Sequence, residues 1–210
     1  EYIWNYELGL KGLWLDGRLQ GDLSVFYMDR DDAQLSQSDQ LDNPSAFVYV
    51  TSNGSASSYG LEASGVLRVS DAWQLHAALG LLDSNIDRWV VRPAVEGREL
   101  AHAPPYTLTL GFTWDGRDGW FARTDWNAVG AYYFDISHDQ KAKPYEVVNI
   151  RAGRQWSRWE ASLWGRNIFD TTYATRGFYF VNEPPYTQAP TLYTRFGSPR
   201  QLGVTFKYRY

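Results

Sequence analysis

The feature that most constrains this sequence is a strict alternation of apolar and polar residues that recurs along its length. In the last ten residues, QLGVTFKYRY, every second position is apolar or aromatic, and the positions between are small, polar or basic. A two-residue period is typical of a β-strand whose two faces meet different environments. Seven other stretches have the same period, namely residues 6–14, 19–27, 61–69, 73–81, 106–114, 148–153 and 159–166. Together with the last strand and the segment around Trp126, they predict about nine strands.

The segments between the expected strands differ systematically in length. Tight hairpin turns are expected at Asp16-Gly17, Ser70-Asp71, residues 115–119 and Ser157-Arg158. Long links, rich in Pro, Ser, Asn and Asp, are expected at residues 31–45, 83–103, 135–144 and 171–199. Short periplasmic turns on one rim and long extracellular loops on the other are typical of an outer-membrane β-barrel.

Composition excludes several other classes of protein. The sequence has no cysteine, which excludes disulfides and thiolate sites, and its formal charge of −4 gives no basic excess to bind nucleic acid. No apolar run approaches the ~20 residues that a membrane-spanning helix needs. The chain begins at Glu1 without a signal-like segment, so we expect it to start inside a longer polypeptide.

The positions of the aromatic residues separate a membrane barrel from a soluble sandwich, which would alternate in the same way. One group lies near the short turns: Trp14, Trp73, Trp114, Trp120, Trp156, Trp159, Tyr208 and Tyr210. A second group lies at the far strand ends: Tyr27, Tyr59, Tyr106, Tyr132 and Phe134. Because indole and phenol rings favour the membrane–water interface, two such bands indicate a lipid-facing wall. A soluble all-β binding module stays an alternative, which extraction from membranes only by detergent would exclude.

Six stretches carry a resemblance to a known family. They are WNYELGLKGLWLDGRL at 4–19, FYMDRDD at 26–32, SYGLEA at 58–63, YEVVNIRAG at 145–153, NIFDTTYATRGFYF at 167–180 and RFGSPRQLGVTFKYRY at 195–210. In order and spacing they resemble the C-terminal part of the barrel of TonB-dependent outer-membrane receptors. The resemblance implies an all-β fold, an antiparallel transmembrane β-barrel fragment with about nine strands of a 22-stranded barrel. Residues 1–210 would be the C-terminal portion, with the plug domain and the N-terminal barrel strands absent.

The same resemblance implies a function and a set of partners. Such receptors take up scarce nutrients across the bacterial outer membrane, most often a ferric siderophore or similar metal chelate. The partners would be outer-membrane lipid and lipopolysaccharide, and TonB acting through the missing N-terminal plug. A passive porin-like barrel is the alternative, and the gene upstream of Glu1 would distinguish the two.

The last strand has a further expected role. In outer-membrane proteins a final strand that ends on an aromatic residue is read by the barrel-assembly machinery. The residues that fit this polar, glycine and aromatic pattern are Gln201, Gly203, Phe206, Tyr208 and Tyr210. An ordinary closing strand would need the same alternation.

Signals for enzymatic chemistry are weak, and no cofactor is expected. His76, His102 and His138 accompany no catalytic or nucleotide-binding motif. An acidic group formed by Asp29, Asp31 and Asp32 could suggest calcium, but its spacing is not that of an EF-hand loop. We therefore interpret the group as an acidic strand end.

Two sets of residues are candidates for ligand contacts. The lumen-facing set is Arg68, Arg123, Asp125, Arg151, Glu160 and Arg166, which could instead line the lumen and pack against the plug. The loop set, which mixes aromatic rings with cations, is Arg176, Phe178, Tyr179, Phe180, Tyr186, Tyr193 and Arg195. That mixture suits an anionic, ring-bearing chelate, although aromatic loops also pack on their neighbours.

Overall fold

The structure is a computed structural model that describes residues 1–38, 49–181 and 189–210. Its main element is one antiparallel sheet of nine strands in these ranges. The strands are β1 (Tyr2–Trp14), β2 (Leu19–Ser38), β3 (Tyr49–Arg68), β4 (Trp73–Arg88), β5 (Tyr106–Asp115), β6 (Trp120–Val129), β9 (Tyr145–Trp156), β10 (Trp159–Arg166) and β13 (Gln201–Tyr208). Two small two-stranded sheets pair β7 (Tyr132–Tyr133) with β8 (Lys141–Ala142), and β11 (Ala174–Phe180) with β12 (Thr191–Phe196). The described residues also form two 3-10 turns, η2 (Pro93–Val95) and η3 (Arg117–Gly119).

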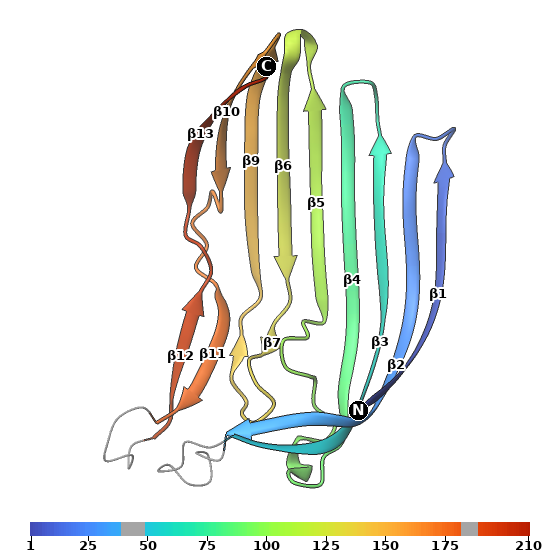
Figure 1. The fold of residues 1–210 in the computed structure, drawn as a ribbon, viewed down its shortest axis with the longest axis vertical. Helices are drawn as coiled ribbons and strands as arrows, with labels where there is room; N and C mark the ends of the chain where they lie inside the picture. Colours follow the sequence, from blue (N-terminus) through green and yellow to red (C-terminus); the bar gives the residue numbers. More distant parts are fainter. Residues whose placement is uncertain (39–48, 182–188) are drawn as a thin grey trace.

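The sheet is open and curved, and its strands follow chain order (Figure 1). Within the described residues β1 forms one edge and β13 the other, so the chain does not close into a cylinder. The tight turns lie together at the end where the C-terminus lies, and the longer connections lie at the opposite end. The predicted fold class and the two kinds of rim are therefore confirmed, whereas the count of 22 strands stays a prediction.

The expected long links contain more strand than the sequence pattern indicates. β2 continues to Ser38 and β3 starts at Tyr49, with an irregularity in their pairing between Arg30 and Ala33. The last link contains the β11–β12 hairpin. Alternation lapses there because these strand ends lie among other loops, with Ala33, Leu35 and Ala56 buried. These strand ends therefore do not have one face toward lipid, and nothing requires their residues to alternate between apolar and polar.

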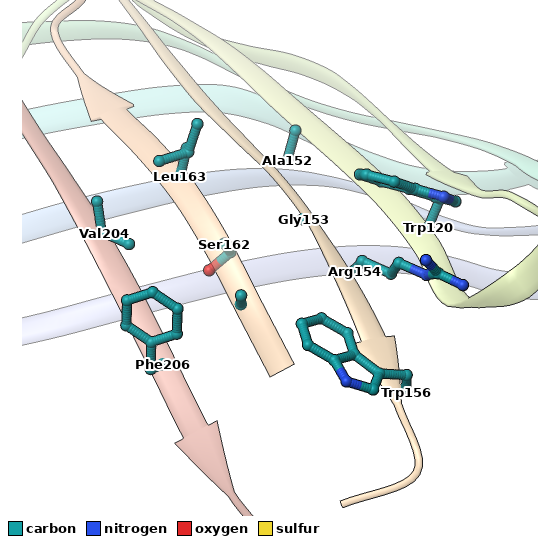
Figure 2. A pocket seen from close by; sticks show the side chains of 10 residues that line it. Trp120, Ala152, Gly153, Arg154, Trp156, Ser162, Leu163, Val204 and Phe206 are labelled. Carbon is teal, nitrogen blue, oxygen red and sulfur yellow. The ribbon is translucent and has the colours of Figure 1, made fainter. Parts of the chain in front are cut away.

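One face of the main sheet is apolar and open to the surroundings. Leu8 is 75% exposed, Leu163 65% and Phe206 73%. Figure 2 shows Leu163, Val204 and Phe206 on β10 and β13. A soluble sandwich would bury these side chains against a second sheet, because exposing them to water costs about 1.5–3 kcal/mol each. This apolar face is suited to lipid.

The buried apolar residues lie mostly among the long connections. One cluster consists of Ala33, Leu35, Ile86, Trp89, Val95 and Ile136. A second consists of Tyr132, Phe134 and Ala142. Tyr132 and Phe134 were expected in the outer aromatic band, and that expectation is wrong, because both rings pack inside this second cluster. The loop side of the sheet thus has its own small hydrophobic cores.

Polar contacts fasten the same connections to one another. The indole N–H of Trp89 donates to Ser52 Oγ at 2.7 Å, and the backbone N–H of Trp89 donates to Glu96 Oε1 at 2.8 Å. The Arg98 guanidinium lies 3.9 Å from the centre of the Tyr133 ring and pairs with Asp139 at 3.1 Å. These contacts join the β4–β5 connection to the β6–β9 connection and to β3.

Of the six tryptophans expected near the short turns, five are exposed and Trp114 is half-buried; the exposed ones are Trp14, Trp73, Trp120, Trp156 and Trp159. Trp73, Trp120, Trp156 and Trp159 are each between 43% and 51% exposed. Trp159 and Tyr208, paired across β10 and β13, have ring centres 4.8 Å apart. No helix in the described part of the chain is long and apolar enough to span a membrane.

Asn167 joins the end of β10 to the segment that precedes β13. Its amide Nδ2 donates to the backbone oxygens of Thr171 at 2.9 Å and Ser198 at 3.1 Å. Its Oδ1 accepts the Thr171 N–H at 2.9 Å, and its own N–H donates to Asn149 Oδ1 at 3.1 Å. Because the residue is buried and fully bonded, the Asn of the NIFD stretch holds this junction together.

Replacing Asn167 with Ala should loosen the junction locally. The change removes three side-chain hydrogen bonds to the backbone of Thr171 and Ser198, each of which contributes about 0.5–1.5 kcal/mol. We expect faster hydrogen–deuterium exchange in residues 167–173 and 197–200 of the full-length receptor. Gln74→Ala, which removes an amide from the polar face without a hydrogen bond in the described residues, is the control. Equal exchange in the two variants would show that Asn167 has no such role.

Candidate functional site

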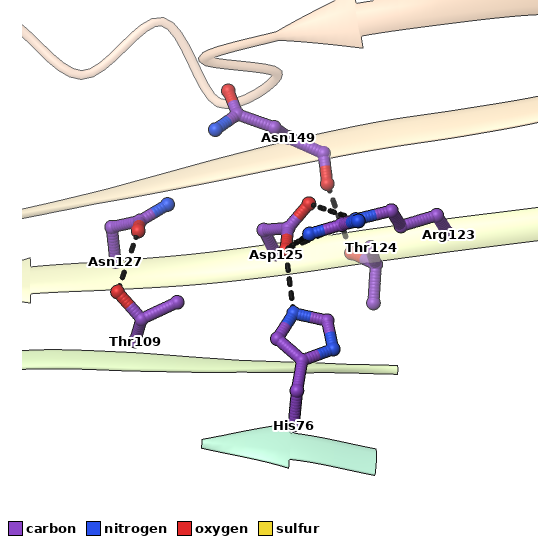
Figure 3. A network of polar contacts seen from close by, with 7 residues as sticks. All are labelled: His76, Thr109, Arg123, Thr124, Asp125, Asn127 and Asn149. Carbon is purple, nitrogen blue, oxygen red and sulfur yellow. Dashed lines mark hydrogen bonds and ion pairs between the residues drawn. The ribbon is translucent and has the colours of Figure 1, made fainter. Parts of the chain in front are cut away.

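The polar face of the sheet carries a three-residue ionic network on β4 and β6 (Figure 3). Asp125 Oδ1 lies 2.7 Å from His76 Nε2 and 2.9 Å from Arg123 Nη2. Arg123 Nε also donates to Asp125 Oδ2 at 3.0 Å, so the guanidinium engages both carboxylate oxygens. The His76 ring lies over Gly111, where a side-chain Cβ would collide with it. This glycine is what lets the imidazole reach across β5 to β6.

A second network on the same face surrounds Glu160 of β10. This carboxylate is only 8% exposed, and Arg151 Nη2 donates to it at 2.6 Å. Lys207 Nζ lies at 3.4 Å and Arg209 Nη2 at 3.8 Å. One buried carboxylate is thus paired with cations from β9, β13 and the residues that follow β13.

A hollow of about 440 Å³ lies between the two networks. It is lined in part by Arg123, Asp125, Arg151, Trp164, Arg166 and Lys207. Cations outnumber carboxylates in this lining, so the hollow has a positive field that suits an anionic partner.

Trp164 belongs to this polar surface, and the sequence reasoning did not select it. Its indole N–H donates to Thr205 Oγ1 at 3.1 Å, and the Arg166 guanidinium lies 5.4 Å from its ring centre. The ring covers Gly203, where a side chain would collide with it. The alternation Glu160, Ser162, Trp164 was the signal that could have placed it there.

Five of the six lumen-facing candidates therefore lie together, and the sixth lies apart from them. Arg123, Asp125, Arg151, Glu160 and Arg166 share one region of the polar face. Arg68 lies on β3, where its register partner is Gln74, and has no part in either network.

The β11–β12 hairpin divides the second set between its two faces. Register pairs Arg176 with Arg195 and Phe178 with Tyr193, so these four residues share one face, and they are all exposed. The two arginines have no carboxylate partner in the described residues. Like charges placed directly opposite each other across a strand pair destabilise it. An anion bound between them would remove that repulsion.

Of the remaining members, Phe180 lies on the same hairpin face as Phe178, and Tyr179 does not. Tyr179 points to the opposite hairpin face, where its ring centre lies 5.4 Å from that of His138. Phe180 and Tyr193 have ring centres 5.1 Å apart. Tyr186 lies outside the described residues.

His138 lies beneath the hairpin in a largely dry environment. Burial, with Arg98 close by, lowers the pKa of His138 below its usual value despite the opposing charges of Asp135 and Asp139. The Gln140 N–H donates to His138 Nδ1 at 3.2 Å, which requires that nitrogen to be unprotonated. His138 is therefore a neutral packing residue at pH 7.

The last strand forms an edge with a two-sided character. On β13, Phe206 and Tyr208 lie on the apolar face, and Gln201, Gly203 and Lys207 lie on the polar one. Tyr210 follows the strand and is fully exposed. In the described residues β13 pairs only with β10, so the backbone N–H and C=O groups on the other edge of β13 have no partner strand there.

The described ranges contain no group of three His, Cys, Asp or Glu residues that could hold a metal ion. An apolar face, rim tryptophans and a charged opposite face together define a wall of a transmembrane β-barrel. The chain belongs to the TonB-dependent receptor-like β-barrel family, whose model matches residues 1–168. It is accordingly a bacterial outer-membrane protein, and the predicted family and localisation are confirmed.

Individual relatives agree with this assignment. The chain is 28% identical over 216 residues to the ferric-pyoverdine BN7/BN8 receptor of Pseudomonas putida, covering 98% of this chain and 22% of that protein. Among solved structures, the ferric yersiniabactin uptake receptor FyuA from Yersinia pestis matches with a TM-score of 0.78 and 23% identity, over 98% of this chain and 29% of that one. The siderophore receptor PiuA from Acinetobacter baumannii gives a TM-score of 0.77 and 16% identity, over 99% and 28%. The chain thus spans less than a third of these relatives.

Proposed function

We propose that residues 1–210 are the C-terminal part of the barrel of a TonB-dependent receptor that imports a ferric siderophore or similar metal chelate. The relatives that match nearly the whole chain are receptors for ferric pyoverdine and ferric yersiniabactin. Since this chain spans under a third of them, the plug and the remaining strands would lie in other parts of the protein. TonB would act through that plug, and the chain itself would carry no enzymatic activity.

The observation that carries the ligand proposal is the exposed face of the β11–β12 hairpin. Arg176 and Arg195 lie opposite each other without a carboxylate partner among the residues that the structure describes, and the rings of Phe178 and Tyr193 adjoin them. Two guanidinium groups can engage a carboxylate or catecholate in a bidentate manner, while the rings stack on a planar ligand. This face would therefore contact an anionic chelate as it enters from outside.

The charged networks on the polar face would have a different role. In a closed barrel this face lines the lumen. The excess of cations around Trp164 would hold an acidic surface of the plug, so this region would position the plug rather than select the chelate.

Binding of ferric chelates to the purified full-length receptor tests the ligand proposal. Arg176→Ala combined with Arg195→Ala should weaken binding of ferric pyoverdine or ferric yersiniabactin, whichever the receptor takes, by about tenfold or more, since hydrogen bonds to charged groups contribute ~1.5–3 kcal/mol. Arg117→Ala combined with Arg158→Ala removes the same charge from the short turns and should leave affinity unchanged. If the two double variants bind the chelate with equal affinity, the hairpin face does not contact the chelate.

Uptake separates the proposal from a passive porin-like barrel. Cells that carry the receptor should accumulate radioactive iron from the chelate only when TonB is present. Accumulation that continues at the same rate without TonB would support the passive barrel instead.

A further inference from the structure

A groove of about 600 Å³ runs along the apolar face near the short-turn rim (Figure 2). Small residues of β9 and β10, Ala152, Gly153 and Ala161, form its floor. Its remaining lining residues are Trp120, Arg154, Trp156, Ser162, Leu163, Val204 and Phe206. The groove is therefore a depression in a lipid-facing surface, with large apolar side chains on both sides of a low floor.

Arg154 is a basic residue on this apolar surface. The register pairs it with Trp120 on the apolar face. The other basic residues in the short-turn half of the nine strands alternate toward the polar face, namely Lys11, Arg68, Arg123, Arg151 and Lys207. A cation on the lipid side of a barrel wall is unfavourable unless it reaches the interface or a counter-charge.

The contacts of Arg154 leave most of its hydrogen-bonding capacity unused. Its Nε donates to the backbone oxygen of Asp118 at 2.9 Å, and its guanidinium lies 5.5 Å from the centre of the Trp120 ring. No carboxylate among the described residues pairs with it. Its two terminal nitrogens are thus held at the rim, at the end of an apolar groove, with donors available to an anion.

We propose that this groove binds one glycerophospholipid of the inner leaflet, with its phosphate on Arg154 and an acyl chain along the floor formed by Ala152 and Ala161. The charge of Arg154 is complementary to a phosphate diester, and the apolar lining is complementary to hydrocarbon. Trp120 and Trp156 set the depth, because indole rings reside at the level of the headgroups. The site lies on the short-turn rim, which faces the periplasm, so the occupant comes from the inner leaflet and not from lipopolysaccharide.

Native mass spectrometry of the full-length receptor, released from nanodiscs of phosphatidylglycerol and phosphatidylethanolamine, tests the proposal. We expect one tightly held phospholipid on the unaltered protein. Arg154→Gln should lower its retention about fivefold, as expected for one cation near a membrane surface. Arg154→Lys should keep most of it. Ala161→Leu, which raises the floor and leaves the charge, should also lower retention.

Arg158→Gln is the matched control, because it removes a cation from the adjacent turn outside the groove. It should retain the phospholipid as the unaltered protein does. The proposal is overturned if Arg154→Gln and Arg158→Gln behave alike, if no phospholipid is retained, or if only lipopolysaccharide remains bound in receptor taken from native membranes. Chelate binding should be unchanged in all these variants, which makes the result independent of the function proposed above.

Discussion

Arginine at position 110 should prevent much of the full-length receptor from reaching its membrane-integrated form. Leu110 lies in the middle of β5 on the apolar face, opposite Ala77 and Trp126. A basic side chain there would sit near the bilayer midplane, where it costs about 2–4 kcal/mol. The measurement is the heat-modifiable fraction of receptor in outer-membrane preparations at matched expression.

Ala78→Arg provides the matched control for this experiment. Ala78 is one residue along β4 from Ala77, lies on the polar face and is exposed without a side-chain partner. An arginine there would meet the hydrated side of the wall and should assemble nearly as well as the unaltered protein. If the two variants assemble equally, the assignment of the faces is wrong.

Serine at both Phe206 and Tyr208 should also reduce insertion strongly while synthesis stays the same. Phe206 packs against the groove described above, and Tyr208 pairs with Trp159 at the rim. Losing these rings removes about 1.5–3 kcal/mol of lipid burial for Phe206 alone, together with an interfacial anchor. It would also remove the aromatic pattern that we expect the barrel-assembly machinery to read.

Two further variants separate burial from recognition. Lys207→Arg keeps a cation beside Glu160 on the polar face and should insert normally. Deleting Tyr210, which is fully exposed and whose ring centre lies 5.5 Å from that of Tyr208, removes little burial. Insertion that survives the deletion of Tyr210 but not the double serine change would assign the effect to burial. If the double serine variant inserts as well as Lys207→Arg, the last strand has no special role.

The wall was predictable because one physical requirement acts on it at every second residue. Each residue such as Leu110 or Phe206 must face lipid, and each neighbour such as Thr109 or Lys207 must face water. A period of two follows directly from that difference. The tight turns were predictable for a similar reason, since a chain that must reverse within two to five residues needs Asp-Gly and similar pairs.

The loop side was less predictable because no single direction there is apolar. Trp89 and Ile86 are fully buried among residues far apart in sequence, and nothing in their local pattern indicates which loops will meet. The candidate set at 176–195 shows the same limit. Its composition indicated an aromatic and cationic surface, but only the pairing of Arg176 with Arg195 separates the outward residues from Tyr179.

The Asn167 junction bears on the order in which the sheet is built. Four of the eight neighbouring strand pairs of the main sheet are joined by tight turns, so their pairing closes small loops at little entropic cost. The pairing of β10 with β13 instead has residues 167–200 between its strands, and long-range closures of this kind are slow. By bonding Thr171 and Ser198 at once, Asn167 brings the two ends of that segment together. We therefore expect Asn167 to influence how fast β13 pairs with β10.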